Sequence, residues 1–282
     1  MKRAGIIHHH KLDAAKALAG ELAGAISAAN VEVWSCPSSE EDRARALVPG
    51  TDLILSIGGD GTILRTARVV VPWPVPILGI NLGKLGFMTE LSAAEARQKL
   101  PGLLAGEGWI EERAMLQVEL FPITEAGAEG PSRTFQGLND VVVGRGAVAR
   151  VIYVEAIIDD ERLTTYKSDG VIVATATGST GYSLATGGPI LYPQSEDILL
   201  RPISPHLSLA HALVLPPTAV VELGVSTDHQ AMLSVDGQID LALHSGDRLK
   251  VRRSPHQARF LRTQPPASFY RMLTQRVATK QF

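Results

Sequence analysis

The sequence predicts an α/β domain built on a parallel sheet, followed by a mostly antiparallel β-sandwich domain. In the first part of the chain, apolar strand-like runs alternate with segments of helical spacing, which is typical of a parallel sheet with helical crossovers. From Glu111 onward, runs rich in Val and Ile are separated by Gly, Pro and Asp, and few segments keep a helical period. A chain of 282 residues that is 45% hydrophobic can bury two cores of this kind.

The first domain is expected to hold a Rossmann-like sheet with a helix after each strand. The helix over Asp13–Ala29 carries Leu22 and Ile26 on one face. Pro37–Pro49 reads as a polar connection with a helical middle, and Ala93–Leu104 as the last helix. Ligands of such sheets bind at the carboxyl ends of the strands. The predicted strands are Arg3–Ile7, Val31–Trp34, the apolar run that ends at Gly58, and Pro76–Ile80.

The second domain is expected to consist of many short strands. We predict an α/β domain over residues 1–110, a β-rich domain over 111–260 and a tail over 261–282 that packs back on the α/β domain. Within the tail, Phe269–Arg276 has helical spacing. The predicted strands are Met115–Phe121, Thr134–Leu138, Asp140–Val143, Val151–Ile158, Arg162–Tyr166, Val214–Pro216, Ala219–Val225, Ala231–Val235 and Arg248–Arg253.

Composition excludes several classes of partner. The net charge of −2 indicates no polybasic surface for nucleic acid or an anionic membrane. No apolar run approaches the length of a membrane span, and the N-terminus lacks the apolar core of a signal peptide. We therefore expect a cytoplasmic protein that binds neither nucleic acid nor membrane.

No dedicated metal site is expected. Cys36 is the only cysteine, so the sequence predicts neither a disulfide framework nor a cysteine metal site, as is usual in a reducing cytoplasm. His8, His9 and His10 stand in a row, which is typical of a metal-binding segment or a tag remnant. Because they directly follow the first strand, we favour a polar loop.

Residues 58–62, Gly-Gly-Asp-Gly-Thr, are the most informative short stretch. They lie between a buried strand and a helix, where backbone N–H groups can approach phosphate oxygens and glycines leave no Cβ in the way. A carboxylate would repel a phosphate, so Asp60 fits a different task. It could accept a proton from an attacking hydroxyl or orient a metal-bound water. The alternative is that Asp60 merely caps the helix.

A second informative stretch covers residues 175–189, which are dense in hydroxyls and glycines. Such a loop offers many neutral donors and acceptors, which suit ribose hydroxyls and amide edges better than a hydrophobic substrate. Tyr182 could stack on a base. The alternative is a Ser/Thr-rich loop that caps a helix over Gly181–Thr186. Asn139-Asp140 and Val235–Gln238 are two further polar segments, each of which a turn could explain.

Taken together, these segments resemble the NAD kinase family, the ATP- or polyphosphate-dependent 2′-kinases of NAD. The glycine–aspartate motif alone also occurs in phosphofructokinases and in diacylglycerol or sphingosine kinases, whereas the run from Asp169 to Pro189 is specific. The likeness extends from about Arg3 to Arg262. Its matching segments, in chain order, are residues 58–62, 79–87, 139–140, 168–189 and 236–238.

The resemblance implies roles for individual residues. Asp60 matches the proton acceptor for the adenosine 2′-hydroxyl of NAD, and Gly61 and Arg65 match positions beside the phosphates of the substrate and the donor. The implied phosphate loop consists of Gly58, Gly59, Gly61 and Thr62. The other implied nucleotide contacts are Asn139 and Asp140 for the ribose hydroxyls, then Arg150, Lys167, Asp169, Thr177, Thr180, Gly181, Tyr182, Ser183 and Gln238.

Three residues depart from the family pattern. Asp140 replaces a glutamate and is one methylene shorter, so its hydrogen bond could lengthen or pass through water. Ala176 replaces a proline, which loosens the loop. Gly181 replaces an alanine and removes a methyl near the base. These changes bear on affinity more than on reaction type.

The resemblance also implies partners and a mechanism. Asp60 would accept the hydroxyl proton as the γ-phosphoryl group is transferred, while positioning and charge neutralisation supply most of the acceleration. Mg²⁺ is expected to arrive with the donor phosphates, because no carboxylate cluster suggests a protein cage. A homodimer or homotetramer is expected, with some nucleotide contacts made across a subunit interface. ATP and polyphosphate remain open as donors, and NAD and NADH as acceptors.

Two other functions remain possible at this point. A lipid kinase would share the glycine–aspartate motif, but it would need a hydrophobic cleft for the lipid or a basic face that binds the membrane. The hydroxyl-rich stretch of residues 175–183 argues against both features. A non-catalytic NAD(H)-binding regulator could keep the same fold, although the presence of Asp60 disfavours it.

Overall fold

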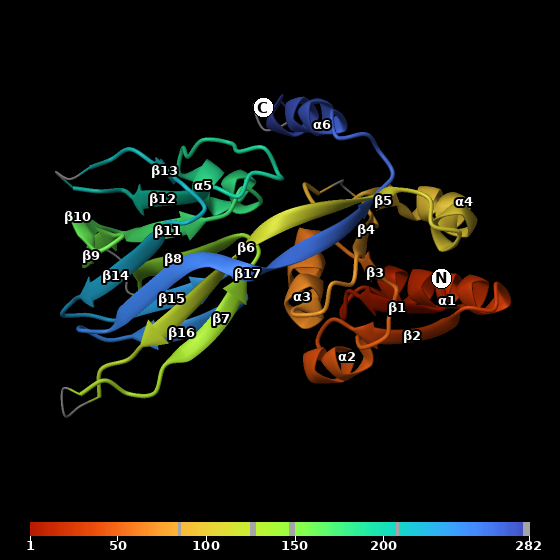
Figure 1. The fold of residues 1–282 in the computed structure, drawn as a ribbon, viewed down its shortest axis with the longest axis horizontal. Helices are drawn as coiled ribbons and strands as arrows, with labels where there is room; N and C mark the ends of the chain where they lie inside the picture. The colour runs from red at the N-terminus through yellow and green to blue at the C-terminus, as the bar shows by residue number, and fades with distance from the viewer. Residues whose placement is uncertain (84–85, 125–127, 147–149, 207–208, 279–282) are drawn as a thin grey trace. The chain divides into compact units, whose positions relative to one another are not determined.

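The computed structural model describes residues 1–83, 86–124, 128–146, 150–206 and 209–278. The chain divides into two units, one of Met1–Glu112 with Ala258–Phe282, the other of Arg113–Gln257 (Figure 1). Lys84 and Leu85, which belong to the segment 79–87, lie outside the described residues, and so does the side chain of Arg276.

The first unit is built on a parallel sheet in the order β2-β1-β3-β4, with β5 beside β4. The end of β17 joins this sheet where Phe260 pairs with Ile77. Strands β3 and β4 are buried along their whole length, as expected for central strands covered on both faces. Strands β2 and β3 lie on opposite sides of β1, so the strand order reverses direction at β1. Sheets of this kind bind ligands at such a switch point, at the carboxyl ends of the strands.

The bounds of the elements in this unit are β1 Arg3–His8, α1 Asp13–Ala28, β2 Glu32–Pro37, α2 Glu41–Leu47, β3 Leu53–Ile57, α3 Asp60–Val70, β4 Ile77–Asn81, β5 Leu91–Ser92, α4 Ala93–Leu104 and α6 Ser268–Ala278. Helices α1 and α4 pack on one face of the sheet, where their apolar residues share a core with Leu55 and Ile57. Helix α3 lies on the other face, since its Thr66 hydroxyl is 2.9 Å from that of Ser56, which points away from Leu55.

The second unit is a β-sandwich. One sheet has the antiparallel order β13-β12-β11-β8-β15-β16, and the other contains β10-β9-β14-β17 with β6 and β7. Their inner faces share one core, in which Val143 and Val173 of the first sheet meet Val154 and Leu223 of the second. The bounds are β6 Trp109–Phe121, β7 Arg133–Gly137, β8 Asp140–Arg145, β9 Ile152–Ile158, β10 Glu161–Ser168, β11 Gly170–Ala174, β12 Ile198–Ile203, β13 Leu213–Leu215, β14 Val220–Ser226, β15 Ala231–Val235, β16 Ile239–Leu243 and β17 Arg248–Arg262, with the short helices η1 Gly178–Thr180 and α5 Tyr182–Ala185.

The predicted fold class is therefore confirmed, and the differences concern single strands. Three strands were not predicted: β5, which has only two residues, β12, whose Arg201-Pro202 pair reads as a break, and β16, which alternates behind a turn. The strand β17 was predicted to end at Arg253 but continues through Pro255 to Arg262. Among the described helices, none is long and apolar enough to cross a membrane.

Candidate active site

The glycine loop joins β3 to α3 at the carboxyl edge of the parallel sheet. Gly58 follows the last residue of β3, and Gly59 is the N-cap residue of α3. Gly59 and Gly61 are exposed, whereas Thr62 is buried. The Thr62 hydroxyl has no hydrogen-bond partner among the residues that the structure describes. The predicted phosphate loop thus presents backbone at the start of a helix, as an anion site requires.

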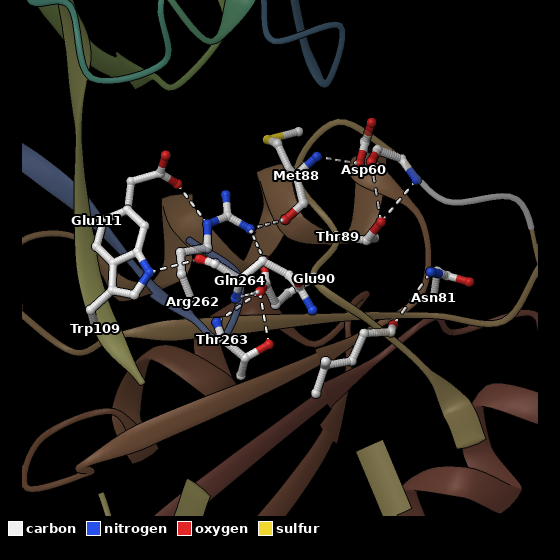
Figure 2. A network of polar contacts seen from close by, with 12 residues as sticks. Asp60, Asn81, Met88, Thr89, Glu90, Trp109, Glu111, Arg262, Thr263 and Gln264 are labelled. Atoms are coloured by element: carbon white, nitrogen blue, oxygen red, sulfur yellow. Dashed lines mark hydrogen bonds and ion pairs between the residues drawn. The ribbon is translucent and has the colours of Figure 1, made fainter. Parts of the chain in front are cut away.

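Asp60 is the first residue of α3, but its side chain does not cap that helix. Its carboxylate accepts a hydrogen bond from the backbone N–H group of Phe87 at 2.9 Å. It accepts a second from the backbone N–H group of Met88 at 3.1 Å, which Figure 2 shows. A Cβ on Gly86 would lie 2.0 Å from Asp60 Oδ1, so glycine is required for this approach. The structure therefore decides against the capping alternative: the backbone of Phe87 and Met88 holds the carboxylate.

The polar groups around this edge come from several strands. Arg65, on α3, keeps a partly exposed side chain and lies 3.9 Å from Glu41, whose nearer partner is Arg68. His10 Nδ1 lies 3.3 Å from the Ser38 hydroxyl, which ties the loop after β1 to the loop after β2. His9 and His10 lie in the loop after β1, as predicted, whereas His8 is the buried last residue of that strand. The described residues contain no His, Cys, Asp and Glu group that could hold a metal ion.

In the second unit, Asn139 and Asp140 lie at the turn into β8. This turn is built by Asp236, whose carboxylate accepts hydrogen bonds from the backbone N–H groups of residues 138, 139 and 140 at 2.7–3.1 Å. Asp140 is 6% exposed. Burial, with the nearby charge of Asp236 as a lesser cause, raises the pKa of Asp140 to about 7.

The hydroxyl-rich loop packs directly on this turn. The Thr175 N–H donates to the carbonyl of Asn139 at 2.9 Å, and its hydroxyl donates to the carbonyl of Leu138 at 2.6 Å. A Cβ on Gly178 would lie 2.0 Å from the Asn139 carbonyl oxygen, so only glycine fits there. A Cβ on Gly181 would lie 3.3 Å from the Gly178 carbonyl oxygen, a tight contact, and 3.7 Å from Asn139 Nδ2. The two sequence motifs therefore form one surface.

Three polar atoms on this surface are buried without a partner. Asn139 Oδ1, Thr177 Oγ1 and Ser183 Oγ make no hydrogen bond with any part of the chain that the structure describes. Most buried polar atoms are satisfied, so this group of three is a candidate binding site for a polar ligand. Thr180 instead donates to the carbonyl of Thr177 at 3.0 Å, and Tyr182 is 46% exposed.

Gln238 lies next to this surface through the turn that contains Asp236. Its backbone N–H donates to the carbonyl of Val235 at 3.0 Å, and the N–H of Asp236 donates to the carbonyl of Asp140 at 2.9 Å. Gln238 was selected from the sequence, whereas Asp236 lay in a segment that a hairpin turn could explain. No local signal reveals the role of Asp236, because its N–H donors lie 96–98 residues away in the chain.

The remaining predicted contacts lie elsewhere in the second unit. Asp169 precedes β11 and forms an ion pair with Arg145 at 3.1 Å, whereas the hydroxyl-rich loop follows β11. Lys167 is exposed, with its ammonium 6.0 Å from the centre of the Tyr153 ring. Arg150 and Tyr153 line a pocket with Thr227, Asp228 and His229. Within one chain, Asp169 and the Asn139 surface therefore lie at opposite ends of a strand, about 20 Å apart.

Comparison with known proteins accounts for both halves of the chain. Residues 27–108 match the family model of the ATP-NAD kinase N-terminal domain, and residues 138–263 match that of the ATP-NAD kinase C-terminal domain. The two matches, which follow each other along the chain, place it in the class of kinases that phosphorylate NAD.

The NAD kinase of Dehalococcoides mccartyi is 49% identical over 272 residues, which cover 96% of this chain and 94% of that protein. The NAD kinase of Chloroflexus aurantiacus is 39% identical over 277 residues, covering 98% and 99%. The chain therefore belongs to the NAD kinase family and is an NAD kinase phosphotransferase.

Solved structures agree in fold. A yeast NADH kinase complexed with NADH superposes with a TM-score of 0.82 at 24% identity, covering 100% of this chain and 89% of the other. An NAD kinase from Archaeoglobus fulgidus in complex with ATP gives a TM-score of 0.76 at 25% identity, covering 98% of both chains.

Proposed function

We propose that this kinase transfers a phosphoryl group from ATP or polyphosphate to the 2′-hydroxyl of the adenosine ribose of NAD, with Asp60 as general base. The main support for the acceptor site is a group of three buried polar atoms that have no hydrogen-bond partner among the described residues. These atoms are Asn139 Oδ1, Thr177 Oγ1 and Ser183 Oγ. The ATP complex of the Archaeoglobus fulgidus relative supports ATP as a donor.

The acceptor nucleoside would meet the surface formed by Asn139, Asp140 and residues 177–183. Asn139 and Asp140 would contact the ribose hydroxyls, because amide and carboxyl oxygens accept such donors well. Thr177, Thr180, Gly181 and Ser183 would line the adenine and ribose, the exposed ring of Tyr182 is free to stack on the base, and Gln238 would add a late contact.

The reacting hydroxyl would lose its proton to Asp60. Two backbone N–H donors orient this carboxylate, and an oriented acceptor within hydrogen-bond reach of the hydroxyl is what a general base requires. The phosphate loop, residues Gly58, Gly59, Gly61 and Thr62, would hold donor oxygens at the start of α3, and the cation of Arg65 would offset their charge. Mg²⁺ would enter bound to the donor phosphates, as part of that substrate.

The active form would be a homodimer or homotetramer. Arg150, Lys167 and Asp169 are implied nucleotide contacts, yet Asp169 lies a strand length from the Asn139 surface in one chain. In an oligomer, a neighbouring chain can bring its own Asp169 to this surface. We further propose one domain over residues 1–110, a second over residues 111–260, and a tail over residues 261–282 that returns to the first domain. We also propose a cytoplasmic location, which the buried free thiol of Cys36 supports.

An activity panel tests the proposal. Purified protein with Mg²⁺ is incubated with NAD or NADH and with ATP or polyphosphate, and NADP(H) is quantified. Thr177→Val and Ser183→Ala remove the buried hydroxyls, and each should raise the Kd for NAD by about 5- to 20-fold. Thr186→Val is the matched control, because the hydroxyl that it removes already donates to the Ser183 carbonyl at 2.9 Å and accepts from Arg201 Nε at 3.0 Å. Protein that binds NAD but forms no NADP with any donor would instead be a regulator.

A further inference from the structure

Arg262, at the end of β17, lies buried in a polar network within the first unit. Its guanidinium donates to Glu111 Oε2 at 2.6 Å and to the carbonyl of Met88 at 3.0 Å, and it lies 3.2 Å from Glu90 Oε2 (Figure 2). The Arg262 side chain is only 6% exposed. A guanidinium suits this place, because its rigid fork can meet several acceptors at once.

The acceptors around Arg262 are themselves held in place. Glu90 Oε1 accepts hydrogen bonds from the Thr263 N–H at 2.7 Å, the Thr263 hydroxyl at 3.0 Å and the Gln264 N–H at 2.9 Å. The N–H of Glu90 donates to the carbonyl of Gly79 in the sheet at 2.8 Å. Trp109 Nε1 donates to the carbonyl of Gln264 at 2.8 Å. The network therefore anchors the segment 88–90 from both sides.

Met88 connects this network to Asp60. Its carbonyl accepts from Arg262, while its N–H donates to Asp60 Oδ1 at 3.1 Å. The same loop is braced at Gly86, whose N–H donates to the Thr89 hydroxyl at 2.8 Å. A shift of the Met88 backbone would therefore displace a donor of the carboxylate that we propose as the base.

The energetics point to a role beyond stability. Burying an ion cluster is often no more stabilising than burying apolar side chains of similar volume, because desolvation offsets the attraction. The benefit of such a cluster is orientation, and a base displaced by about 1 Å can lose about 10²-fold in rate.

We propose that Arg262 is a positioning residue, which fixes the Asp60 carboxylate through the backbone of Met88. The inference rests on the proposed role of Asp60 as general base. Arg262 touches no substrate in this scheme. Its effect should therefore appear in kcat rather than in the KM for NAD, and only while Asp60 is present to be positioned.

A double-mutant cycle tests this. Arg262→Lys keeps the buried positive charge but loses the forked guanidinium group, so it is the main variant. Arg262→Met leaves the carboxylates of Glu90 and Glu111 without a positive partner, and it serves as a second variant. Both are measured alone and with Asp60→Asn, at a temperature where circular dichroism shows every variant folded. Arg259→Met is the matched control: Arg259 is on the same strand and pairs with Glu112 at 2.9 Å, outside the network.

We expect Arg262→Lys to lower kcat by about 10- to 100-fold with the KM for NAD changed less than about twofold. In the Asp60→Asn background it should change kcat by less than about twofold, because coupled residues are not additive. The positioning role would be overturned if Arg262→Lys lowered kcat by the same factor in both backgrounds. It would also be overturned if Arg262→Lys were fully active while Asp60→Asn was inactive, and in both cases the proposed function would stand. Near wild-type turnover by Asp60→Asn would overturn both.

Discussion

The carboxyl group of Asp140 is buried beside Asp236, whose carboxylate accepts hydrogen bonds from the backbone N–H groups at the turn into β8. Asp236 thus has the donors that stabilise a charge. The pKa of Asp140 rises to about 7 because burial, and then the charge of Asp236, disfavours its ionised form. The Asp140 carboxyl group therefore exchanges its proton near neutral pH.

Stability should accordingly fall as pH rises toward neutral. The folded protein binds the Asp140 proton more tightly than the unfolded chain, so this contribution is fully present below about pH 4 and is lost by about pH 7. The loss is on the order of 4 kcal/mol. In urea denaturation between pH 4 and 8, Asp140→Asn should remove most of this decline and be more stable than the wild type at pH 8. The exposed Asp240→Asn is the control, and an unchanged slope in Asp140→Asn would contradict the prediction.

Asp60→Asn should leave a folded protein that binds NAD and turns over about 10²- to 10⁴-fold more slowly. Asparagine has a single acceptor oxygen, so one of the hydrogen bonds from Phe87 and Met88 is lost, at about 1 kcal/mol. Steady-state kinetics, NAD titration and thermal denaturation separate the two effects.

The control for this substitution is Asp52→Asn. Asp52 also accepts hydrogen bonds from two backbone N–H groups, those of Lys2 and Arg3, but at the start of β1. Both bonds go to one oxygen, Oδ2, so asparagine can keep them, and Asp52→Asn should lose little stability and keep its turnover. If Asp60→Asn turned over as fast as Asp52→Asn, the general-base role would be wrong.

Gly178→Ala should disrupt the nucleotide surface. Its Cβ would meet the Asn139 carbonyl at 2.0 Å, and backbone cannot yield cheaply. We expect a loss of about 1–3 kcal/mol in unfolding free energy, together with weaker NAD binding because Asn139 must move. Gly24→Ala, in α1 with no atom within 4 Å of its Cβ, should instead stabilise by about 0.5–1 kcal/mol. Denaturation gives the unfolding free energy, and calorimetry gives the affinity for NAD. If Gly178→Ala changed neither, the close packing of Gly178 on Asn139 would be refuted.

Mixing two inactive variants should restore activity if Asp169 acts across a subunit interface. Asp60→Asn keeps a working Asp169, and Asp169→Ala keeps a working Asp60. In a mixed oligomer, therefore, some sites receive both. Co-refolded mixtures are assayed against each variant alone, with light scattering to establish the assembly. A fully active monomer, or a mixture no more active than its parts, would contradict the oligomer proposal.

Much of the site was open to prediction because its residues cluster in short motifs. The glycine loop follows a buried strand, and residues 175–189 carry hydroxyls and glycines in one run, so local composition was enough to select them. Arg262 and Glu111 were not selected, since each reads as an ordinary charged residue near a strand end. Only burial distinguishes them, and burial depends on partners more than 150 residues apart in the sequence, such as Arg262 and Glu111.

By itself, the sequence determined the fold class and the family, because hydrophobic periodicity and motif order are local properties of the chain. Tertiary structure alone decided three things: that Asp60 is held by Phe87 and Met88 rather than capping its helix, that Asp236 builds the turn at Asn139, and that Asp169 lies at the far end of β11. Each depends on a contact, or on a strand length, between segments distant in the sequence. No local pattern records such a relationship, because it arises only when the strands pair.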